Sequence, residues 1–385
     1  MQDRVLTRDF GLVTAAHFLQ ALGYASMVLL PVYLDYLDAS RTEIGLIMAS
    51  ASLSGLLARP GVAWMLDHVG YRATVVAGTL TLSLGMVSFF FVRDVGWQAL
   101  LARMAVGVGT GSLFTAYFAL ASRIVPASRR TQGLALFGIS GLVPLVVNPL
   151  AQSWGIAPVD LRLFFPVIGV ATLLSLVPIV PLRNPKSEGP AERPTWKSTL
   201  RALRQPALRP VWLATIALAG FAASFMTYVT VVAAARAVPN PSSLWFAYAG
   251  GAALVRLGFG GVAERMGPSR LVAPAFVIFC AAGVAAATAQ SSTAFFAAGL
   301  LAGLGHGIGF PVITSLAVSR TPEHLRGAGM ATLTGFWELS TLTLTPMFGL
   351  ISDHVGDRAM FFALSSLALS TALTWGPLER RHPVT

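Results

Sequence analysis

Four ionisable residues stand inside long apolar stretches, where a charge is costly. Glu338 lies in GFWELSTLTLTP and Arg103 in LARMAVGVGTG, while His17 and His306 lie in two further apolar runs. An ionisable group at membrane depth costs about 2.5 to 3.5 kcal/mol on insertion scales, so each one marks a candidate site. Glu338 has the chemistry of a carboxylate that gains a proton when desolvated and loses it when a cation approaches. The alternative for Glu338 is a hydrogen-bonded packing role.

Polar and aromatic side chains accompany these four groups. Gln20 follows His17 by about one helical turn. Aromatic residues that could line a cavity are Tyr24, Phe225, Tyr228, Trp245, Tyr248 and Trp337. The predicted pathway for a solute and protons consists of His17, Gln20, Tyr24, Arg103, Tyr228, His306, Trp337 and Glu338. Packing is the alternative, because a lone histidine is often a satisfied interior group and aromatic rings also gather at membrane interfaces.

The composition indicates a membrane protein. Of 385 residues, 55% are hydrophobic and only 11% are charged, and the mean hydropathy is +0.69. Soluble domains carry about 25% charged residues, so a soluble enzyme is excluded. Cys280 is the only cysteine, which excludes a disulfide scaffold. The sequence contains no recognisable pairing of a nucleophile with a base and no metal-ligand spacing, so we predict neither an enzyme nor a cofactor. The alternative is a membrane-embedded enzyme or a non-transporting sensor. An enzyme would need a catalytic cluster that converges at one membrane face.

The apolar stretches predict twelve membrane-spanning helices and no strands. A span needs about 20 mostly apolar residues, because every backbone polar group in hydrocarbon must bond within its own helix. The predicted spans are 10–34, 42–66, 73–92, 98–122, 132–154, 161–182, 207–236, 241–263, 271–290, 293–318, 328–351 and 359–377. The first run lacks the small-residue cleavage site of a signal peptide, so we interpret it as a retained helix.

A hydrophilic segment divides the predicted spans into two sets of six. Residues 183–206 contain no apolar run of spanning length, which predicts an N-terminal bundle over 1–182, a cytoplasmic linker, and a C-terminal bundle over 207–385. We interpret the segment as a solvated linker. The alternative for its part TWKSTLRALR is a short amphipathic helix on the membrane surface.

The basic residues are distributed unevenly across the predicted loops. Most of the 27 lysines and arginines lie on the side of the linker and both termini. The opposite loops hold Arg41, Arg93, Arg162, Arg236 and Arg358. By the positive-inside rule both termini are cytoplasmic. The net charge of +11 therefore reflects membrane topology and contact with the lipid bilayer, and we predict no nucleic-acid partner.

The second half of the chain repeats the first at an offset of about 197 residues. The pairs at this offset are Arg59 with Arg256, Gly61 with Gly258, Asp67 with Glu264 and Gly70 with Gly267. GVGTG at 107–111 likewise matches GLGHG at 303–307. A same-direction duplication of six spans predicts two six-helix bundles related by an axis along the membrane normal, with a solute site between them.

The loops after the second and eighth predicted spans carry a family resemblance. On ARPGVAWMLDHVGYR (58–72) and VRLGFGGVAERMGPSR (255–270), the chain resembles the major facilitator superfamily, whose signature reads G-x-L-A-D-R-x-G-R-K. Ala63, His68 and Tyr71 depart from that signature. The resemblance implies a cytoplasmic gate latched by Asp67, Gly70, Arg72, Glu264, Arg265, Gly267 and Arg270. A tight turn that needs only the permissive backbone of Gly70 and Gly267 is the alternative.

Two further segments correspond to sequence motifs of the superfamily. Arg103 to Gly107 is similar to the R-x-x-Q-G mark of the fourth span, with Val106 replacing the glutamine, and the resemblance implies that Arg103 tunes the protonation of a nearby acid. GLVPLVVNPLAQSWG at 141–155 lacks the Gly-Pro pair of relatives that export drugs against protons. Pro144 and Pro149 are expected to bend this span.

The resemblance implies an all-α transporter of the major facilitator fold that works by alternating access. We expect a bacterial inner membrane, since arginine outnumbers lysine by 25 to 2, and we expect a monomer. The predicted activity is proton-coupled efflux of a small amphipathic compound. The alternative is uptake or facilitated movement of a sugar or an organic anion: Arg103 and the histidines suit an anion, and Glu338 suits a cation.

Overall fold

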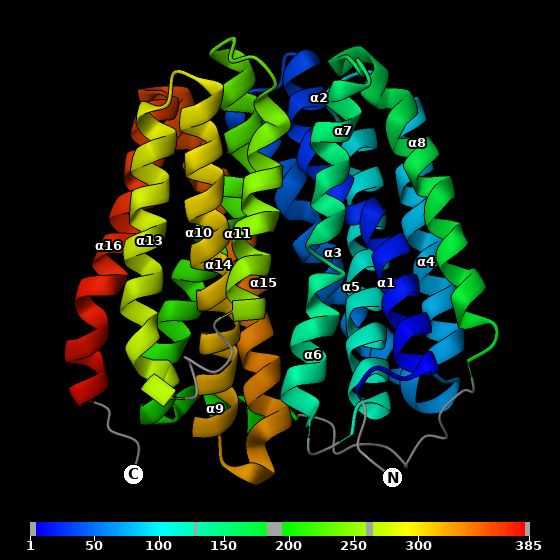
Figure 1. Ribbon diagram of the computed structural model, residues 1–385, viewed down its shortest axis with the longest axis vertical. Coiled ribbons are helices and arrows are strands. Elements are labelled where there is room, and N and C mark those ends of the chain that lie inside the picture. Colours follow the sequence, from blue (N-terminus) through cyan, green and yellow to red (C-terminus); the bar gives the residue numbers. More distant parts are fainter. Residues whose placement is uncertain (1–4, 127–128, 183–194, 259–264, 382–385) are drawn as a thin grey trace. The chain divides into compact units, whose positions relative to one another are not determined.

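A computed structural model describes residues 5–126, 129–182, 195–258 and 265–381 (Figure 1). Within these ranges every regular element is a helix, and ten helical segments are long and apolar enough to cross a membrane. The other two predicted spans fall in α11 (Leu244–Gly258), which ends where the described residues end, and in α15 (Arg326–Val355), where Glu338 and several threonines lower the hydropathy. The predicted all-α membrane fold is confirmed.

The chain forms two compact units. One contains Met1–Ala39 and Leu46–Pro190, and the other contains Ser40–Gly45 and Ala191–Thr385. Helices of the first unit are α1 (Arg8–Ser26), η1 (Met27–Leu29), α2 (Leu30–Tyr36), α3 (Arg41–His68), α4 (Tyr71–Ser88), η2 (Phe89–Phe91), α5 (Trp97–Ile124), α6 (Arg130–Ile139), η4 (Val143–Val146), α7 (Val147–Ser153), η5 (Pro158–Asp160), α8 (Leu161–Thr172) and η6 (Leu173–Ile179). The first five residues of α3 group with the second unit.

Among the described residues, the second unit contains α11, α15, the start of α3 and eight further helices or 3-10 turns. They are α9 (Trp196–Arg204), η7 (Pro206–Leu208), α10 (Arg209–Ala235), η8 (Pro241–Ser243), α13 (Pro268–Thr288), α14 (Ser292–Arg320), η9 (Glu323–Leu325) and α16 (Asp357–Arg381). In this unit α13 packs against α14 and α16, as α4 packs against α5 and α8 in the first unit.

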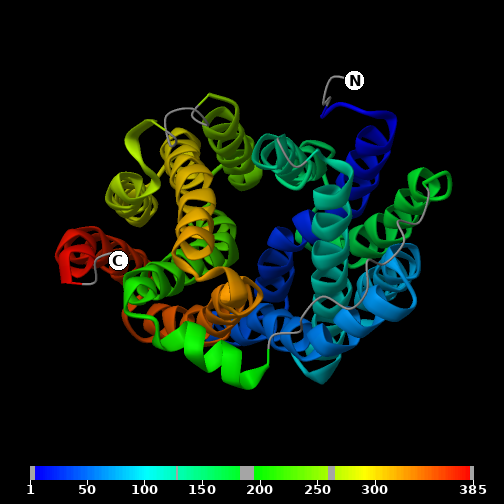
Figure 2. The same ribbon diagram turned by 90° about the horizontal axis from the view of Figure 1, so that it is seen from below.

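Part of the hydrophilic segment between the two sets of spans is helical. Helix α9 begins after Thr195, whose hydroxyl accepts a hydrogen bond from Ser198 N at 3.1 Å. Ala202 is buried, whereas Lys197 and Arg201 are exposed. The helix contacts η9 and α15 and is seen from the side in Figure 2, where most long helices are seen closer to end-on. The short-helix alternative therefore describes residues 196–204 better than a solvated linker, and 183–194 lie outside the described residues.

The internal repeat recurs as a backbone contact inside each unit. A Cβ added to Gly107 on α5 would overlap Ala51 O on α3, and one added to Gly303 on α14 would overlap Tyr248 O on α11. Ala51 and Tyr248 are themselves 197 positions apart. Small residues let helix backbones approach closely in lipid, so these glycines set the spacing of equivalent helix pairs in the two units.

In each unit, a side chain near the end of the first spanning helix donates hydrogen bonds to carbonyl groups at the end of the third spanning helix. The Tyr33 hydroxyl donates to Val92 O at 2.6 Å, and Arg236 Nη1 donates to Ala289 O at 2.7 Å and to Ala286 O at 2.9 Å. Val92 and Ala289 occupy equivalent positions in the repeat. These carbonyl groups lack partners within their own helices, so side-chain donors satisfy them.

We expect Arg236→Ala to lower the unfolding free energy by about 2 kcal/mol, because it removes charge-assisted hydrogen bonds to the end of α13. Thermal unfolding of the purified protein in detergent measures the change. Arg93→Ala, at an exposed loop residue, is the matched control. Equal melting temperatures for the two variants would show that water replaces Arg236 at no cost.

Candidate functional site

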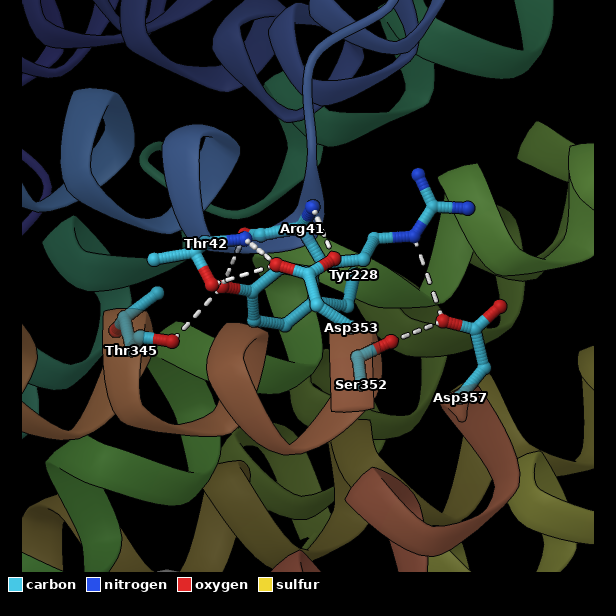
Figure 3. A network of polar contacts seen from close by, with 7 residues as sticks. All are labelled: Arg41, Thr42, Tyr228, Thr345, Ser352, Asp353 and Asp357. Atoms are coloured by element: carbon cyan, nitrogen blue, oxygen red, sulfur yellow. Dashed lines mark hydrogen bonds and ion pairs between the residues drawn. The ribbon is translucent and has the colours of Figure 1, made fainter. Parts of the chain in front are cut away.

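The first turn of α3 is capped by an acidic side chain from α15. Asp353 Oδ1 accepts from Arg41 N at 2.8 Å, and its Oδ2 accepts from Thr42 N at 2.8 Å and from Thr42 Oγ1 at 2.6 Å (Figure 3). Ser40 and Glu43 form a local capping box, in which Ser40 Oγ accepts from Glu43 N and Glu43 Oε2 accepts from Ser40 N. All three first-turn N–H groups therefore have acceptors, and a carboxylate stands at the positive end of the helix dipole.

The Asp353 carboxyl lies beyond the predicted span 328–351, and the capping hydrogen bonds shift its pKa. Burial raises its pKa, but the hydrogen bonds from Thr42 and from the backbone N–H groups of Thr42 and Arg41, with the charge of Arg41, hold the pKa below its ordinary value of 3.8. A depressed folded-state pKa stabilises the fold above the ordinary pKa, and that contribution is lost as the pH falls through the lower folded value. The cap is therefore ionised at neutral and mildly acidic pH.

The same network extends to Asp357 and to Tyr228. Arg41 Nε lies 3.3 Å from Asp357 Oδ1, which also accepts a hydrogen bond from Ser352 Oγ. The Tyr228 hydroxyl lies 2.8 Å from Thr345 O and 3.1 Å from Arg41 O (Figure 3). Tyr228 is fully buried. Its single hydroxyl hydrogen is therefore shared between carbonyl groups of two helices.

Two glycines make room for the Tyr228 hydroxyl. A Cβ at Gly45, on α3, would overlap the hydroxyl oxygen and come within 2.7 Å of Pro346 Cα, and a Cβ at Gly349 would lie 2.5 Å from the hydroxyl oxygen. The start of α3, α10 and α15 therefore meet at one point in the second unit. Tyr228, predicted to lie on the solute pathway, is placed in this junction of backbone carbonyls.

A second cluster surrounds His306 within the same unit. The Tyr248 hydroxyl lies 2.5 Å from His306 Nδ1, and the His306 ring is stacked on Trp337 with 6.3 Å between centroids. Phe310 meets both rings edge-on, at 5.9 Å from His306 and 5.5 Å from Trp337. Two predicted pathway residues, His306 and Trp337, are thus brought together, with Tyr248 as a hydrogen-bond partner.

The first unit contains a corresponding cluster around His17. His17 Nδ1 lies 2.7 Å from Ser140 Oγ, and the His17 ring lies 4.5 Å from Phe137 and 5.5 Å from Tyr117, centroid to centroid. Ser140 Oγ is also 2.6 Å from Phe137 O. Because the single serine hydrogen is donated to that carbonyl, His17 Nδ1 must donate to Ser140, which places a hydrogen on Nδ1.

Tyr24 and Gln20, on the same helix as His17, differ in their bonding. The Tyr24 hydroxyl donates to Gly141 O at 2.6 Å, next to Ser140. Gln20 is buried, and its Oε1 accepts no hydrogen bond from any residue that the structure describes. His17 and Tyr24 therefore contact adjacent residues, Ser140 and Gly141, and Gln20 keeps an unused acceptor.

Arg103 and Glu338 occupy the interiors of their helices. The Nε atom of Arg103 is buried and has no hydrogen-bond partner in the described ranges. Glu338 lies near the middle of α15, directly after Trp337, with intermediate exposure. The proton role of both residues stays a prediction.

The predicted cytoplasmic turns are built on glycines with positive φ. Gly70 has φ +105° and precedes α4, and Gly267 has φ +81° and precedes α13. Asp67 lies in the last turn of α3, Arg72 in the first turn of α4, and Arg265 and Arg270 flank Gly267. Glu264 lies outside the described residues. The conformational need for glycine at both turns is confirmed, and the gating role of the charged residues stays a prediction.

The sequence matches the Major Facilitator Superfamily over residues 13–246 and 240–385. The chain belongs to this superfamily. The uncharacterized MFS-type transporter YhhS of Escherichia coli is 25% identical over 382 residues, covering 93% of this chain and 89% of YhhS. The multidrug resistance protein MdtG of Salmonella arizonae is 23% identical over 378 residues, covering 93% of this chain and 92% of MdtG.

Solved transporters share the fold at low identity. The nucleoside transporter NupG superposes with a TM-score of 0.81 at 8% identity, covering 96% of this chain and 99% of NupG. A peptide transporter POT in complex with sulfate gives 0.80 at 14% identity, covering 97% of this chain and 94% of the transporter. The chain is accordingly a multi-pass membrane transporter of the major facilitator fold, and transporters of this superfamily are not enzymes.

Membership of this superfamily does not account for the Asp353 cap, which our sequence analysis missed. Its signal is present in the sequence: DHVG occurs at 67–70 and again at 353–356. The second glycine, Gly356, has φ +104°, close to the value at Gly70. A search for repeats at offsets other than 197 would have identified Asp353 as a second copy of Asp67.

Proposed function

We propose that the protein exports a small amphipathic organic solute from a bacterial cell in exchange for protons. The observation that carries this proposal is the position of Glu338, the single carboxylate inside the twelve predicted spans apart from Glu43 in the first turn of α3. A carboxylate in the membrane interior is costly and marks a proton or ion pathway. The similarity to a protein named for multidrug resistance supports the direction of transport.

The two histidine clusters are the proposed solute contacts. Each unit presents aromatic rings together with hydroxyl groups, around His17 in one unit and His306 in the other. Ring faces bind apolar surface, and the few N–H and O–H groups orient a polar end. This combination suits an amphipathic compound better than a sugar, which needs many hydrogen-bond partners.

The proposed gates are the two DHVG turns. Asp353 caps the first turn of α3, and Asp67 ends the same helix in an identical tetrapeptide. Capping by a carboxylate is worth about 1 kcal/mol, so an engaged cap shifts a two-state equilibrium about fivefold. We infer that each aspartate stabilises a different conformation of the transport cycle.

Asp353→Asn and Asp67→Asn are each expected to change the counterflow rate of reconstituted protein about fivefold, with little change in solute affinity. Asparagine keeps the shape of the side chain but removes the charge that favours the helix N-terminus. Asp94→Asn, in an exposed loop, is the control. A loss of affinity at an unchanged rate would assign these residues to solute binding instead of gating.

The test of the proposed function begins with a thermal-shift screen of sugars, carboxylates and lipophilic cations against purified protein, since a ligand that binds the folded state raises its melting temperature. The compound that stabilises most is then loaded into proteoliposomes containing a pH dye. We expect an imposed pH gradient to drive solute movement, with protons moving in the opposite direction. Flux that is identical with and without the gradient would refute proton exchange.

A further inference from the structure

We propose that the transported solute carries an anionic group and that Arg103 binds this group. The inference rests on the proposed function and names the solute's charge. Arg103 lies in the predicted span 98–122, in the second turn of α5, and its Nε is buried with no hydrogen-bond partner among the residues that the structure describes. Burying a guanidinium costs hydration free energy, and without an opposite charge nearby little of that cost is recovered.

The backbone around Arg103 is held against a neighbouring helix. Ser54 Oγ on α3 donates to Met104 O at 2.7 Å, and Gly107, one turn further along α5, lies against the backbone of Ala51. These contacts fix the rotation of α5 about its axis at the level of Arg103. The guanidinium therefore projects from a defined position and is not free to turn toward the lipid by rotation of its helix.

The face of α5 that carries Arg103 has further polar groups at a spacing of seven residues. Thr110 and Tyr117 follow at i+7 and i+14, which places all three residues on nearly one stripe of the helix. Tyr117 lies edge-on to the His17 ring at 5.5 Å, so this stripe is directed toward α1. Thr110 Oγ1 is buried and has no hydrogen-bond partner in the described ranges. Arg103 and Thr110 are both donors, which an oxygen-rich anion would satisfy.

The predicted spans of the first half contain fewer carboxylates than arginines. In the predicted spans of the first half, Glu43 is the one carboxylate, and it accepts hydrogen bonds from Ser40 N and Oγ at 2.9 Å each. The same spans of the first half contain three arginines, Arg59, Arg103 and Arg162. The excess of cations favours a solute that brings its own negative charge.

The chemistry of the guanidinium narrows the class of anion. Its planar fork of N–H donors matches carboxylate, sulfonate and phosphate oxygens in bidentate geometry. His17 Nδ1 already donates to Ser140, so this nitrogen is not available to the anion. An aromatic body with one such oxyanion group would satisfy Arg103 and the neighbouring rings together.

The test uses two probes with the same ring and opposite charge, 1-naphthalenesulfonate and 1-naphthyltrimethylammonium, in equilibrium dialysis against the purified full-length protein. We expect the wild type to bind the sulfonate more tightly. Arg103→Gln should weaken sulfonate binding about tenfold or more and leave the cation unaffected. Arg103→Lys should recover part of the loss, and Arg93→Gln should behave as wild type. Tighter binding of the cation by the wild type, or equal sulfonate binding by Arg103→Gln, would overturn the proposal.

A stability measurement separates an unpaired cation from a structural one. Removing an unpaired buried charge should leave the melting temperature unchanged or raise it, and the sulfonate should stabilise the wild type but not Arg103→Gln. A lower melting temperature for Arg103→Gln without ligand would show a structural role and overturn the proposal. Proton-driven exchange of the cation with no binding of the sulfonate would refute the anion site alone. Arg103-dependent sulfonate binding without transport would refute the transport function alone.

Discussion

Gly303→Ala is expected to lower the stability of the second unit by about 3 kcal/mol. The added Cβ would overlap Tyr248 O and come within 2.8 Å of Tyr248 C and Cα. These are backbone atoms of α11, so no side chain can rotate away, and the two helices must separate. Separation would also displace Tyr248 from His306, so we expect solute binding to weaken in any protein that remains folded.

Thermal unfolding in detergent, followed by size-exclusion chromatography, measures the effect. Gly250→Ala is the matched control: it lies on α11, nothing approaches the position of its Cβ within 4 Å, and alanine improves helix propensity by up to about 1 kcal/mol. Gly107→Ala should reproduce the loss in the first unit, because Gly107 meets Ala51 in the same way. Equal stability of the Gly303 and Gly250 variants would show that α11 and α14 separate at little cost.

The spans and the repeat were predictable because they depend on composition along the chain. Hydrocarbon demands long apolar helices whatever their neighbours, so hydropathy alone places most of them. Gly107 and Gly303 matched at an offset of 196, and the structure gives them equivalent contacts with α3 and α11. Gly70 and Gly267 were predicted as turn residues, and both have positive φ.

The irregular segments of the first unit depended on partners that hydropathy does not reveal. The first predicted span is interrupted by the 3-10 turn η1, directly after Ala25 and Ser26. Ala25 O accepts a hydrogen bond at 3.0 Å from Asn148 Nδ2, which lies in α7. The bend of the fifth span was predicted from Pro144 and Pro149, because proline removes a helical hydrogen bond from its own position.

The pairing of site residues could not be predicted, since it depends on the rotation and distance of packed helices. His306 and Trp337 were both singled out, but their stacking and the bond to Tyr248 follow from the packing of three helices. Tyr228 was predicted on the solute pathway, and the structure shows its hydroxyl in contact with the carbonyl groups of Thr345 and Arg41. Sequence analysis identified residues with chemistry, and the structure assigns their partners.

Glu338→Gln is expected to remove the dependence of transport on the pH gradient. Glutamine has nearly the shape of glutamic acid and keeps its hydrogen-bonding capacity, but it can neither gain nor lose a proton near neutral pH. If Glu338 carries the proton, the variant should accumulate solute to the same extent with and without a gradient. Counterflow, which exchanges labelled for unlabelled solute at equal pH, should continue, because it requires binding and the conformational change without net proton movement.

Two further variants sharpen this test. Glu338→Asp retains a titrating group on a shorter side chain and should keep the gradient dependence at a reduced rate. Glu323→Gln, at a carboxylate in η9 that is 87% exposed and pairs with Arg326, changes the net charge equally and should behave as wild type. Apart from Glu338, the only carboxylate within the predicted spans is Glu43, which lies at the start of α3. No other acid in the middle of a predicted span could therefore take over proton transfer from Glu338. Gradient-driven accumulation that persists in Glu338→Gln would therefore remove Glu338 from proton movement and assign that movement to another group, such as a histidine cluster.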